Sequence, residues 1–427
     1  MRKIVCAPEN LIPPELKPGI KYICTYSNSR REDVGYFGPS LKKDIIKRGL
    51  IVSSKIWDFT TIALSVAAAD NSISRSKSPD GWTRQISLDI YLHDPEPWKD
   101  LKERLQKTLK FLTGDFWEIN FLGGGSEPPQ HKNIQAYDSD CISLLSGGVD
   151  SLVGAIDLVA NSRKPLFVSQ VVRGDSHSQR EFAKRLGSEK NHFQWSHKMH
   201  WPRGESEIST RGRSIIFFAF AVIASSAITS SGGSPVEIIV PENGFMSLNI
   251  PLNPGRIGSF STKTTHPIYL KGIQDIFDFL GINAKLVLPY RFITKGEMIA
   301  ECKNQGLLKE LISESTSCGK YSRHGHMHCG RCVPCMVRRA AFLKANIQDT
   351  TVKGYKFSNL SHDGLVHGSN DVGAMASACL KYRQYGIRAI IGGSLSFAQC
   401  SNRKDYEGVI SRGFEEIEQL LIENGVI

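Results

Sequence analysis

The sequence predicts an α/β protein built on a doubly wound parallel sheet, and three observations support this. From Asp138 onward, short apolar runs typical of strands alternate with segments of helical apolar spacing. This alternation favours a parallel sheet with helices on both faces. The glycine-rich stretch SGGVDS, at 146–151, stands where a strand ends and a helix begins. Four of the ten cysteines crowd into residues 318–335, which favours a metal site over disulfides.

Composition sets broad limits on the class of protein. With 427 residues the chain is long enough for two or three domains, and its net charge of +11 favours anionic partners such as nucleotides, nucleic acid or an acidic protein. The lysines and arginines are dispersed, so no basic run indicates a nucleic-acid stripe. No apolar run reaches the roughly 18 residues of a membrane span, and the first residues lack the apolar centre of a signal peptide. We therefore expect a cytoplasmic protein.

Residues 1–136 are predicted to form an N-terminal α+β accessory domain. Apolar spacing predicts a helix over 57–71 and an amphipathic helix over 94–117. Strict alternation of apolar and polar residues predicts a half-buried strand over 84–92. The Gly- and Pro-rich segment 123–133 is predicted to link this domain to the next.

Residues 137–345 carry the repeated strand–helix units. The predicted strands cover 141–146, 165–172, 236–240 and 284–290. The predicted helices cover 151–162, 178–187, 214–227 and 273–282. Ligands of such sheets bind beyond the carboxyl ends of the strands, where SGGVDS and the loops after Val240 and Leu288 are expected. Residues 346–427 form a C-terminal extension with a last helix over 413–424.

The SGGVDS stretch has the composition of an anion-binding loop. A helix N-terminus carries partial positive charge and unpaired N–H groups, and glycine lets the backbone approach an anion closely. We expect the phosphate contacts to come from Ser146, Gly147, Gly148, Val149 and Ser151. Asp150 can cap the helix or help hold the magnesium ion that accompanies a nucleotide. The spacing alone also fits a Gly-Gly turn before a capped helix, and it is not the GxxxxGK[ST] motif of ordinary P-loops.

The cysteine cluster has the spacing of a metal site. Four thiolates can form the closed tetrahedral shell of structural zinc, and the predicted ligands are Cys318, Cys329, Cys332 and Cys335. Three histidines in the long first gap could replace a sulfur ligand: His324, His326 and His328. A [4Fe–4S] cluster is the competing interpretation, although closed CxxC knuckles suit zinc better.

These motifs together resemble a known enzyme family. SGGVDS matches the SGGxDS signature of the PP-loop ATP pyrophosphatases, which cleave ATP between the α and β phosphates. With the pattern C-x(10)-C-G-x-C-x-x-C followed by Arg338, the chain resembles the QueC family of 7-cyano-7-deazaguanine synthases. Segments 211–221 and 288–302 also resemble this family. The resemblance implies a sheet of the adenine nucleotide alpha hydrolase-like (HUP) type, a four-cysteine zinc site, ATP with Mg²⁺, and a 7-carboxy-7-deazaguanine substrate converted with ammonia to an amide and then a nitrile.

The layout departs from a minimal QueC. Such a protein has about half this length, without the first 136 residues or the long tail. Segment 241–267 also differs from an ordinary QueC substrate loop. The whole layout is more similar to the larger QueC-like proteins of bacterial anti-phage defence operons, of the QatC type, including the stretches DGWTR at 80–84 and LTGDFW at 112–117.

The resemblance also suggests which side chains act on the substrates. Positive charge for the phosphates is expected from Arg173, Arg213, Lys263 and Lys295. Arg213 is the strongest candidate because it opens a helix in a matching segment, and the other three fit solvated surface cations equally well. The residues expected to act in catalysis are Ser146, Asp150, Ser151 and Arg213.

A second group of residues is expected to contact the base and the substrate. Glu242 and Asn243 could bind the amidine edge of a purine-like base, although Asn243-Gly244 also fits a simple turn. Polar residues over 259–266 are expected to form a substrate loop. Within it, His266 fits a hydrogen-bonded loop histidine better than a proton shuttle.

The acceptor of the activated group is the open question at this stage. Ammonia would give the nitrile, whereas the additional regions could present the amine of a protein partner encoded in a defence operon, which we favour. Two further alternatives are a nucleic-acid-modifying PP-loop enzyme, such as a tRNA thiolase or a lysidine-type ligase, and a non-catalytic nucleotide-binding scaffold. An intact SGGVDS argues against the scaffold.

Overall fold

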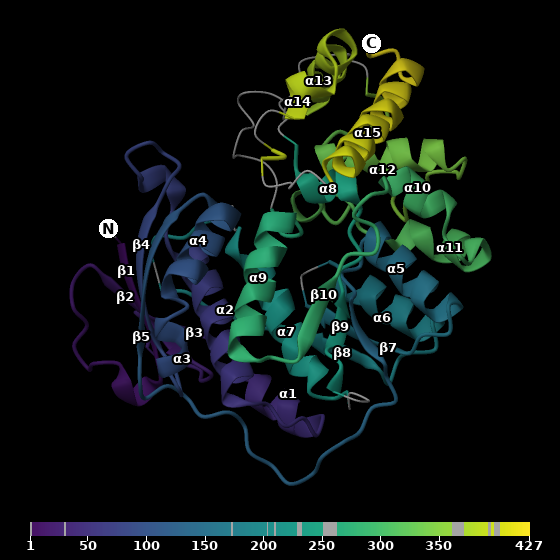
Figure 1. Cartoon of the computed structure of the whole chain (residues 1–427). Coiled ribbons are helices and arrows are strands. Elements are labelled where there is room, and N and C mark those ends of the chain that lie inside the picture. Colours follow the sequence, from purple (N-terminus) through teal and green to yellow (C-terminus); the bar gives the residue numbers. More distant parts are fainter. Residues whose placement is uncertain are drawn as a thin grey trace.

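Two five-stranded parallel sheets organise the molecule (Figure 1). The computed structural model describes residues 2–29, 31–171, 174–202, 204–208, 211–228, 233–250, 263–360, 371–391, 394–396 and 402–427. The front sheet, ordered β3-β2-β1-β4-β5, consists of β1 (Arg2–Ala7), β2 (Ile20–Thr25), β3 (Val34–Phe37), β4 (Gln85–Tyr91) and β5 (Phe116–Leu122). The second sheet, ordered β10-β9-β6-β7-β8, consists of β6 (Cys141–Leu144), β7 (Pro165–Gln170), β8 (His192–Trp195), β9 (Val236–Ile239) and β10 (Ala284–Val287).

The two sheets share one topological plan. In each, the first strand lies in the middle, the next two strands lie on one side of it, and the last two lie on the other. The direction of winding therefore reverses beside the first strand, between β6 and β9 in the second sheet. Such a switch point opens a crevice at the carboxyl ends of the strands, and this is where ligands of parallel sheets bind.

Helices fill the space between the sheets and cover the far face of the second sheet (Figure 1). Residues 2–122, which carry the front sheet and are called the front region, contribute α1 (Leu41–Lys47), α2 (Ser54–Ser72), α3 (Glu96–Lys99) and α4 (Lys102–Thr113). The second region contributes α5 (Val149–Ala160), α6 (Ser176–Arg185), α7 (Ile215–Ser225), α9 (Pro267–Leu280), α10 (Lys295–Ala300), α11 (Gln305–Leu311) and α12 (Val333–Lys344). A further group comprises α8 (Gly244–Leu248), α13 (Asp371–Tyr385), α14 (Ile387–Ile391) and α15 (Arg403–Glu423).

A single hydrophobic core joins the two sheets. Helix α2 packs against α7, and α4 packs against α9. Helices α2 and α7 are apolar around most of their circumference, as expected for helices buried on all sides. The core runs from the inner face of the front sheet through these helices to β6 and β7. The predicted boundary at 136 falls within segment 123–140, which has no helix or strand. Because the two sheets share one core, the division into separate domains stays a prediction.

The predicted α+β class of the front region is wrong. All pairings of its sheet are parallel, so the region has α/β architecture. The first three strands are short and carry no strict alternation of apolar and polar residues. The predicted helix over 94–117 covers α3, α4 and the start of β5, with α4 ending at Gly114 in a left-handed conformation. Strand β5 is real because Trp117, Ile119 and Phe121 alternate toward the core.

The C-terminal helices build a separate hydrophobic cluster. Residues of α13, α14 and α15 pack against α8 and α12. The tail therefore rests on the second sheet's helices, close to the segment that follows β9 (Figure 1). The last predicted helix, over 413–424, is the end of the longer α15.

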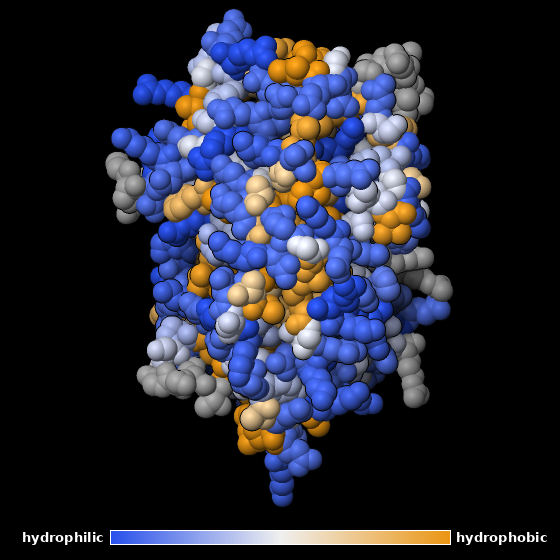
Figure 2. Space-filling view, turned by 90° about the vertical axis from the view of Figure 1, so that its right-hand side faces the viewer, coloured by the Kyte–Doolittle hydropathy of each residue, from blue (hydrophilic) through white to orange (hydrophobic). Residues whose placement is uncertain are grey.

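The surface offers no broad apolar region on the face shown in Figure 2. This face is predominantly hydrophilic, with hydrophobic side chains in small separate patches. No helix within the described ranges combines the length and the apolar character that crossing a bilayer requires.

Candidate functional site

The SGGVDS loop lies at the junction that the sequence predicts. Strand β6 ends at Leu144 and helix α5 begins at Val149, with Gly148 as its N-cap residue. Gly147 has a φ of +91°, a left-handed conformation that favours glycine. Its carbonyl accepts a hydrogen bond of 2.9 Å from the N–H of Thr316, which attaches the loop to the chain that leads into the cysteine cluster.

The two serines of the loop hold its shape. The hydroxyl of Ser146 hydrogen bonds to that of Ser151 over 3.1 Å and accepts the N–H of Gly148 over 3.3 Å. Ser151 also donates to the carbonyl of Gly148 over 3.0 Å. The buried amide of Gln179, on α6, donates to the carbonyl of Ser146 over 3.0 Å. These bonds fix the shape of the loop before any ligand binds. The N-terminus of α5, which follows the loop, lies at the crevice.

A buried group of charges adjoins the loop. Asp150, on the first turn of α5, forms an ion pair with Lys295, and its Oδ2 accepts the Asn243 side-chain amide over 2.7 Å. Burial alone would raise the pKa of Asp150, but the charge of Lys295 and hydrogen bonds from Glu242 and Asn243 lower it below the ordinary range. Burial and the Asp150 carboxylate raise the pKa of Glu242 well above its usual range. The two carboxyl groups therefore shift in opposite directions, with the pKa of Asp150 lowered and that of Glu242 raised.

This acid pair fits a divalent cation in its chemistry. The carboxyl groups of Asp150 and Glu242 lie close together beside Lys295, and oxygen ligands of this kind suit Mg²⁺. Asp150 and Glu242 are therefore the residues that would hold the magnesium ion of a nucleotide. Both oxygens of Asp150 already have protein partners, Lys295 on Oδ1 and Asn243 on Oδ2, so cation binding would have to release one of them.

The loop and the charge group open into one cavity of about 370 Å³. Its polar wall comprises Ser146, Gly148, Asp150, Ser151, Asp175, Glu242, Thr264, Thr265, Lys295, Thr316 and Ser317. Its apolar wall includes Leu144, Val149, Phe217, Phe218, Val240, Pro241, Met246 and Pro334. An anion-binding corner beside an apolar wall is the arrangement that a nucleotide or a flat heterocycle requires.

The predicted cations separate into different environments. Lys295 lines the cavity, whereas Arg213 does not. Arg213 acts at a distance on Asp175, which does line the cavity. Burial raises the pKa of Asp175, and a hydrogen bond from Thr316 and the charge of Arg213 partly oppose this rise. The Lys263 ammonium lies 4.3 Å from the ring centre of Phe111 on α4 and does not line the cavity. Arg173 lies outside the described residues.

Asn243 caps helix α8 rather than forming a turn. Asn243 is fully buried, accepts the N–H of Met246 over 3.0 Å and does not line the cavity, so only Glu242 is placed to contact a ligand. Gly244 begins α8 in close contact with the carbonyl of Arg291. The alternative of a simple Asn-Gly turn is therefore wrong, and the predicted contact of Asn243 with a base stays a prediction that its place outside the cavity lining does not support.

The substrate-loop residues are described only from 263 onward. Thr264 and Thr265 line the cavity, whereas the predicted contacts at 259–262 lie outside the described residues. His266 caps α9 by accepting the N–H of Ile268 over 3.2 Å, and burial lowers its pKa to about 4. These properties fit the hydrogen-bonded loop histidine and not a proton shuttle at neutral pH.

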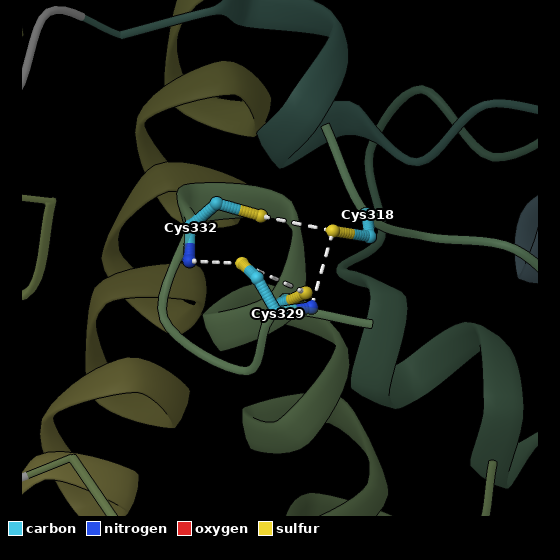
Figure 3. A group of neighbouring side chains, drawn as sticks. Cys318, Cys329 and Cys332 are labelled. Carbon is cyan, nitrogen blue, oxygen red and sulfur yellow. Dashed lines mark hydrogen bonds between the residues drawn. The ribbon is translucent and has the colours of Figure 1, made fainter. Parts of the chain in front are cut away.

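The four predicted cysteines converge, and their sulfur atoms lie within 4.8 Å of one another. Figure 3 shows Cys318, Cys329 and Cys332 pointing toward a common centre. The sulfurs of Cys318 and Cys332 are 3.9 Å apart, as are those of Cys329 and Cys335. A tetrahedron with zinc–sulfur bonds of about 2.3 Å has edges of about 3.8 Å, so the cluster fits zinc.

Backbone donors complete the surroundings of the sulfurs. The N–H groups of Lys320 and Cys329 donate to the Cys318 sulfur over 3.3 Å, and that of Cys332 donates to Cys329 over 3.2 Å. Such bonds stabilise thiolate ligands. Gly330 is required in the knuckle because its φ is +84° and a Cβ would lie 2.2 Å from the carbonyl oxygen of Phe357.

The three histidines of the long gap lie outside the sulfur cluster. His328 accepts the N–H of Ser317 over 3.1 Å, and His324 contacts Lys356. His326 packs beside Gly174, near Asp175. These contacts support the all-sulfur ligand set. The buried guanidinium of Arg338, on α12, joins this helix to the chain on both sides of the cluster. Its hydrogen-bond partners are Ile312, Ser315, Asp349 and Thr350.

The front region holds the segment that carries Arg213. Asp70, at the end of α2, accepts the backbone N–H groups of Arg211 and Gly212, each over 2.6 Å. Asp70 also forms a fully buried ion pair with Arg84, which in turn pairs with Asp115. The stretches 80–84 and 112–117 thus supply a buried charge network that fixes the entry to α7.

Several cavity residues escaped sequence reasoning. Thr316 and Ser317 line the cavity because the chain must pass the loop before reaching Cys318. Asp175 follows β7 at the same sheet edge, so the carboxyl-edge rule could have identified it. Phe217 and Phe218 lie on a helix whose uniform apolar character hides which side chains reach the cavity.

Comparison with known proteins gives distant and partial similarity. No protein-family model matches this chain, and no solved structure matches it. It is 33% identical over 99 residues to a 7-cyano-7-deazaguanine synthase of Brucella anthropi, which covers 23% of this chain and 36% of the relative. The synthase of Agrobacterium fabrum is 34% identical over 98 residues, covering 23% and 35%. That of Methanococcus maripaludis is 40% identical over 89 residues, covering 20% and 38%.

These relatives support the expected resemblance at its coarser level. The chain spans about a third of the length of the curated relatives it matches. The similarity to these synthases agrees with the resemblance carried by the SGGVDS loop and the cysteine cluster, whereas the closer resemblance to QatC-type proteins stays a prediction. The chain therefore has distant, partial similarity to the 7-cyano-7-deazaguanine synthases of the QueC family.

Proposed function

We propose that this protein uses ATP to activate the carboxylate of a 7-deazaguanine substrate, such as 7-carboxy-7-deazaguanine, and transfers the acyl group to an amine. The observation that carries this proposal is the cavity in which the SGGVDS loop, the Asp150–Glu242 acid pair and Lys295 meet an apolar wall. The partial similarity to 7-cyano-7-deazaguanine synthases supports both the nucleotide and the substrate class.

The proposed chemistry has two steps. A carboxylate oxygen of the substrate attacks the α-phosphorus of ATP, the bond to the bridging oxygen between the α and β phosphates breaks, and pyrophosphate leaves. The amine then attacks the carbonyl carbon of the acyl adenylate, AMP departs with its oxygen, and the nitrogen loses a proton. Activation is necessary because an oxide anion is a poor leaving group whereas AMP is a good one.

The residues of the cavity suit the first step. The N–H groups at the start of α5 and the hydroxyls of Ser146 and Ser151 would bind the departing pyrophosphate, and Lys295 would balance its charge. Mg²⁺, held by Asp150 and Glu242, would neutralise further phosphate charge. Arg213 would contribute positive charge toward the phosphates from outside the cavity, near Asp175. Phe217 would contact a flat ring.

The cysteine cluster has a structural role in this proposal. Four thiolates fill a tetrahedral zinc shell and leave no position for substrate. Zinc would fix the chain from Thr316 to Gly319, which lines the cavity directly beside the phosphate loop.

For the acceptor we propose the amine of a protein partner in an anti-phage defence system. The similarity to the synthases extends over at most 99 of the 427 residues, which leaves most of the chain for tasks beyond the shared chemistry. Ammonia needs no docking surface, whereas a macromolecular amine does. A front sheet fused to the nucleotide-binding sheet through one core could supply such a surface without moving relative to the site.

The test measures products with defined acceptors. Purified protein is incubated with ATP, Mg²⁺ and 7-carboxy-7-deazaguanine, with ammonium or with proteins encoded beside its gene. AMP and pyrophosphate are quantified by chromatography, and acceptor proteins by intact-mass spectrometry. We expect AMP formation and a mass gain on one partner. Free nitrile with no mass gain would refute the protein acceptor, and absence of AMP under all conditions, including added RNA, would refute the activation chemistry.

A matched pair of variants assigns the activity to the site. Asp150→Asn should reduce AMP formation by at least a hundredfold, because the charge partner of Lys295 and a proposed magnesium ligand are lost. Asp157→Asn makes the same change two turns along α5, where the carboxylate contacts Tyr290 and Lys303 instead of the cavity. It should retain AMP formation.

A further inference from the structure

We infer that the C-terminal helix α15 is part of the working site, because Glu416 positions Lys295 by bracing the first turn of helix α10. This inference rests on the proposed function insofar as Lys295 acts on the phosphates. It concerns a region that the similarity to a minimal synthase does not require, and it assigns a role to a residue 122 positions away in sequence from its contact, Thr294.

Lys295 depends on the start of a very short helix. Thr294 is the N-cap residue of α10, and Glu297 returns a hydrogen bond to the Thr294 N–H over 2.8 Å, which completes a capping box. Lys295 is the next residue, and its buried ammonium pairs with Asp150 across the cavity. A helix of six residues has little stability of its own, so tertiary contacts must fix its first turn.

Glu416 provides such a contact from α15. Its carboxylate accepts the hydroxyl of Thr294 and the backbone N–H of Gly296, and the side chain is only 8% exposed. A Cβ at residue 296 would lie 2.6–2.8 Å from the carboxyl atoms of Glu416. The glycine thus lets α15 approach α10 closely enough for an acidic group to sit at the helix N-terminus, where it is stabilised by the unpaired N–H groups.

Arg412 makes the same connection one turn earlier on α15. Its guanidinium pairs with Glu297 and donates to the carbonyl of Phe292 over 2.7 Å. Both members of the capping box, Thr294 and Glu297, are therefore held by α15. Lys295 lies between Thr294 and Glu297 in sequence, and its ammonium pairs with Asp150 of the SGGVDS loop. A shift of α15 would therefore move this ammonium relative to Asp150.

The test compares three substitutions. Glu416→Ala removes the acceptor, Glu416→Gln keeps an oxygen acceptor of the same shape, and Glu415→Gln changes the charge at the exposed neighbouring position. Amide hydrogen exchange of α10 in the ligand-free protein reports positioning directly. Steady-state AMP formation, resolved into kcat and KM for ATP, reports its consequence.

We expect Glu416→Ala to speed exchange in the first turn of α10 by about tenfold and to lower kcat/KM by a similar factor, the scale of one lost hydrogen bond. Glu416→Gln should stay within about twofold of the natural protein, and Glu415→Gln should equal it. Unchanged exchange and kinetics in Glu416→Ala, or equal losses in Glu415→Gln, would overturn the inference.

A second variant covers the case in which Glu416→Ala fails to fold. Gly296→Ala keeps every side chain and inserts one methyl group against the Glu416 carboxylate, so it should loosen the same turn. If the natural protein forms no AMP at all, the proposed function is refuted, and the exchange data still decide whether Glu416 positions α10. If AMP forms but Gly296→Ala and Glu416→Ala both exchange like the natural protein, the inference alone fails.

Discussion

Glu416 also gives the protein a predictable dependence of stability on pH. Burial raises its pKa from the ordinary 4.5 to about 7, with the hydrogen bond from Thr294 opposing the shift and the charge of Glu297 adding to it. The cations that face it are Lys344, on α12, and Arg412, on its own helix. The folded protein therefore binds a proton that the unfolded chain has already released between these two pH values.

The sign and size of the effect follow from this difference. A raised pKa means that the stabilising contribution is complete below pH 4.5 and is lost as pH rises toward 7. At about 1.4 kcal/mol for each unit of pKa, the loss is about 3 kcal/mol. Glu416→Gln removes the ionisation and should be more stable than the natural protein by about this amount at pH 8, relative to their difference at pH 4.5.

Urea unfolding at a series of pH values measures this gap. Glu415→Gln, which alters an exposed carboxylate, is the control and should show no growing difference. A difference between Glu416→Gln and the natural protein that stays constant from pH 4.5 to 8 would refute the reasoning, since it would show that Glu416 ionises normally in the folded state. A gap that grows toward acid pH would reverse the sign and also refute it.

Three further substitutions test the parts that surround the site. Cys332→Ser should abolish stoichiometric zinc, measured by elemental analysis, and lower the unfolding temperature; full zinc occupancy would contradict the four-sulfur shell. Asp70→Asn should cost about 3–5 kcal/mol in urea unfolding, because it leaves the buried Arg84 without half of its charge partners. Gly244→Ala should destabilise by about 1–3 kcal/mol, since its Cβ would lie 2.1 Å from the carbonyl oxygen of Arg291; unchanged stability would show that α8 can shift freely.

Local patterns predicted where the SGGVDS loop lies and that the four cysteines converge. SGGVDS is a continuous stretch, so strand, loop and helix could be placed around it from sequence alone. The four cysteines are similarly close in sequence, and their spacing indicated a closed shell that the structure confirms. Lys295 was one of four candidate cations, and sequence could not rank it because the decisive contact, with Asp150, joins residues 145 positions apart.

The parts that sequence reasoning missed depend on contacts between distant segments. Strand β8 has only four residues, too few for a clear periodic signal, and β5 begins three residues after α4 ends, so the helical spacing before it masked its alternation. The class of the front sheet depends on strand direction, which is set by pairing and not by local composition. The bracing role of Glu416 is invisible in sequence because a buried glutamate on an amphipathic helix resembles any exposed one.

The shared core leads to a last prediction about modularity. Residues 137–345 contain the loop, the cysteine cluster and the whole second sheet. Cutting the chain at 136 would nevertheless expose the face of α7 that α2 covers, and cutting it at 345 would expose α12 and remove the brace at Thr294.

The isolated segment 137–345 should therefore aggregate or unfold without cooperativity, because large apolar surface that α2 and α15 bury would face water. Circular dichroism on heating, with size-exclusion chromatography, compares it with the full chain. A monomeric segment that unfolds cooperatively would show that the accessory regions are separable modules. Failure of the segment to fold, under conditions in which the full chain folds, would show that the central sheet needs the front region and α15 to keep its structure.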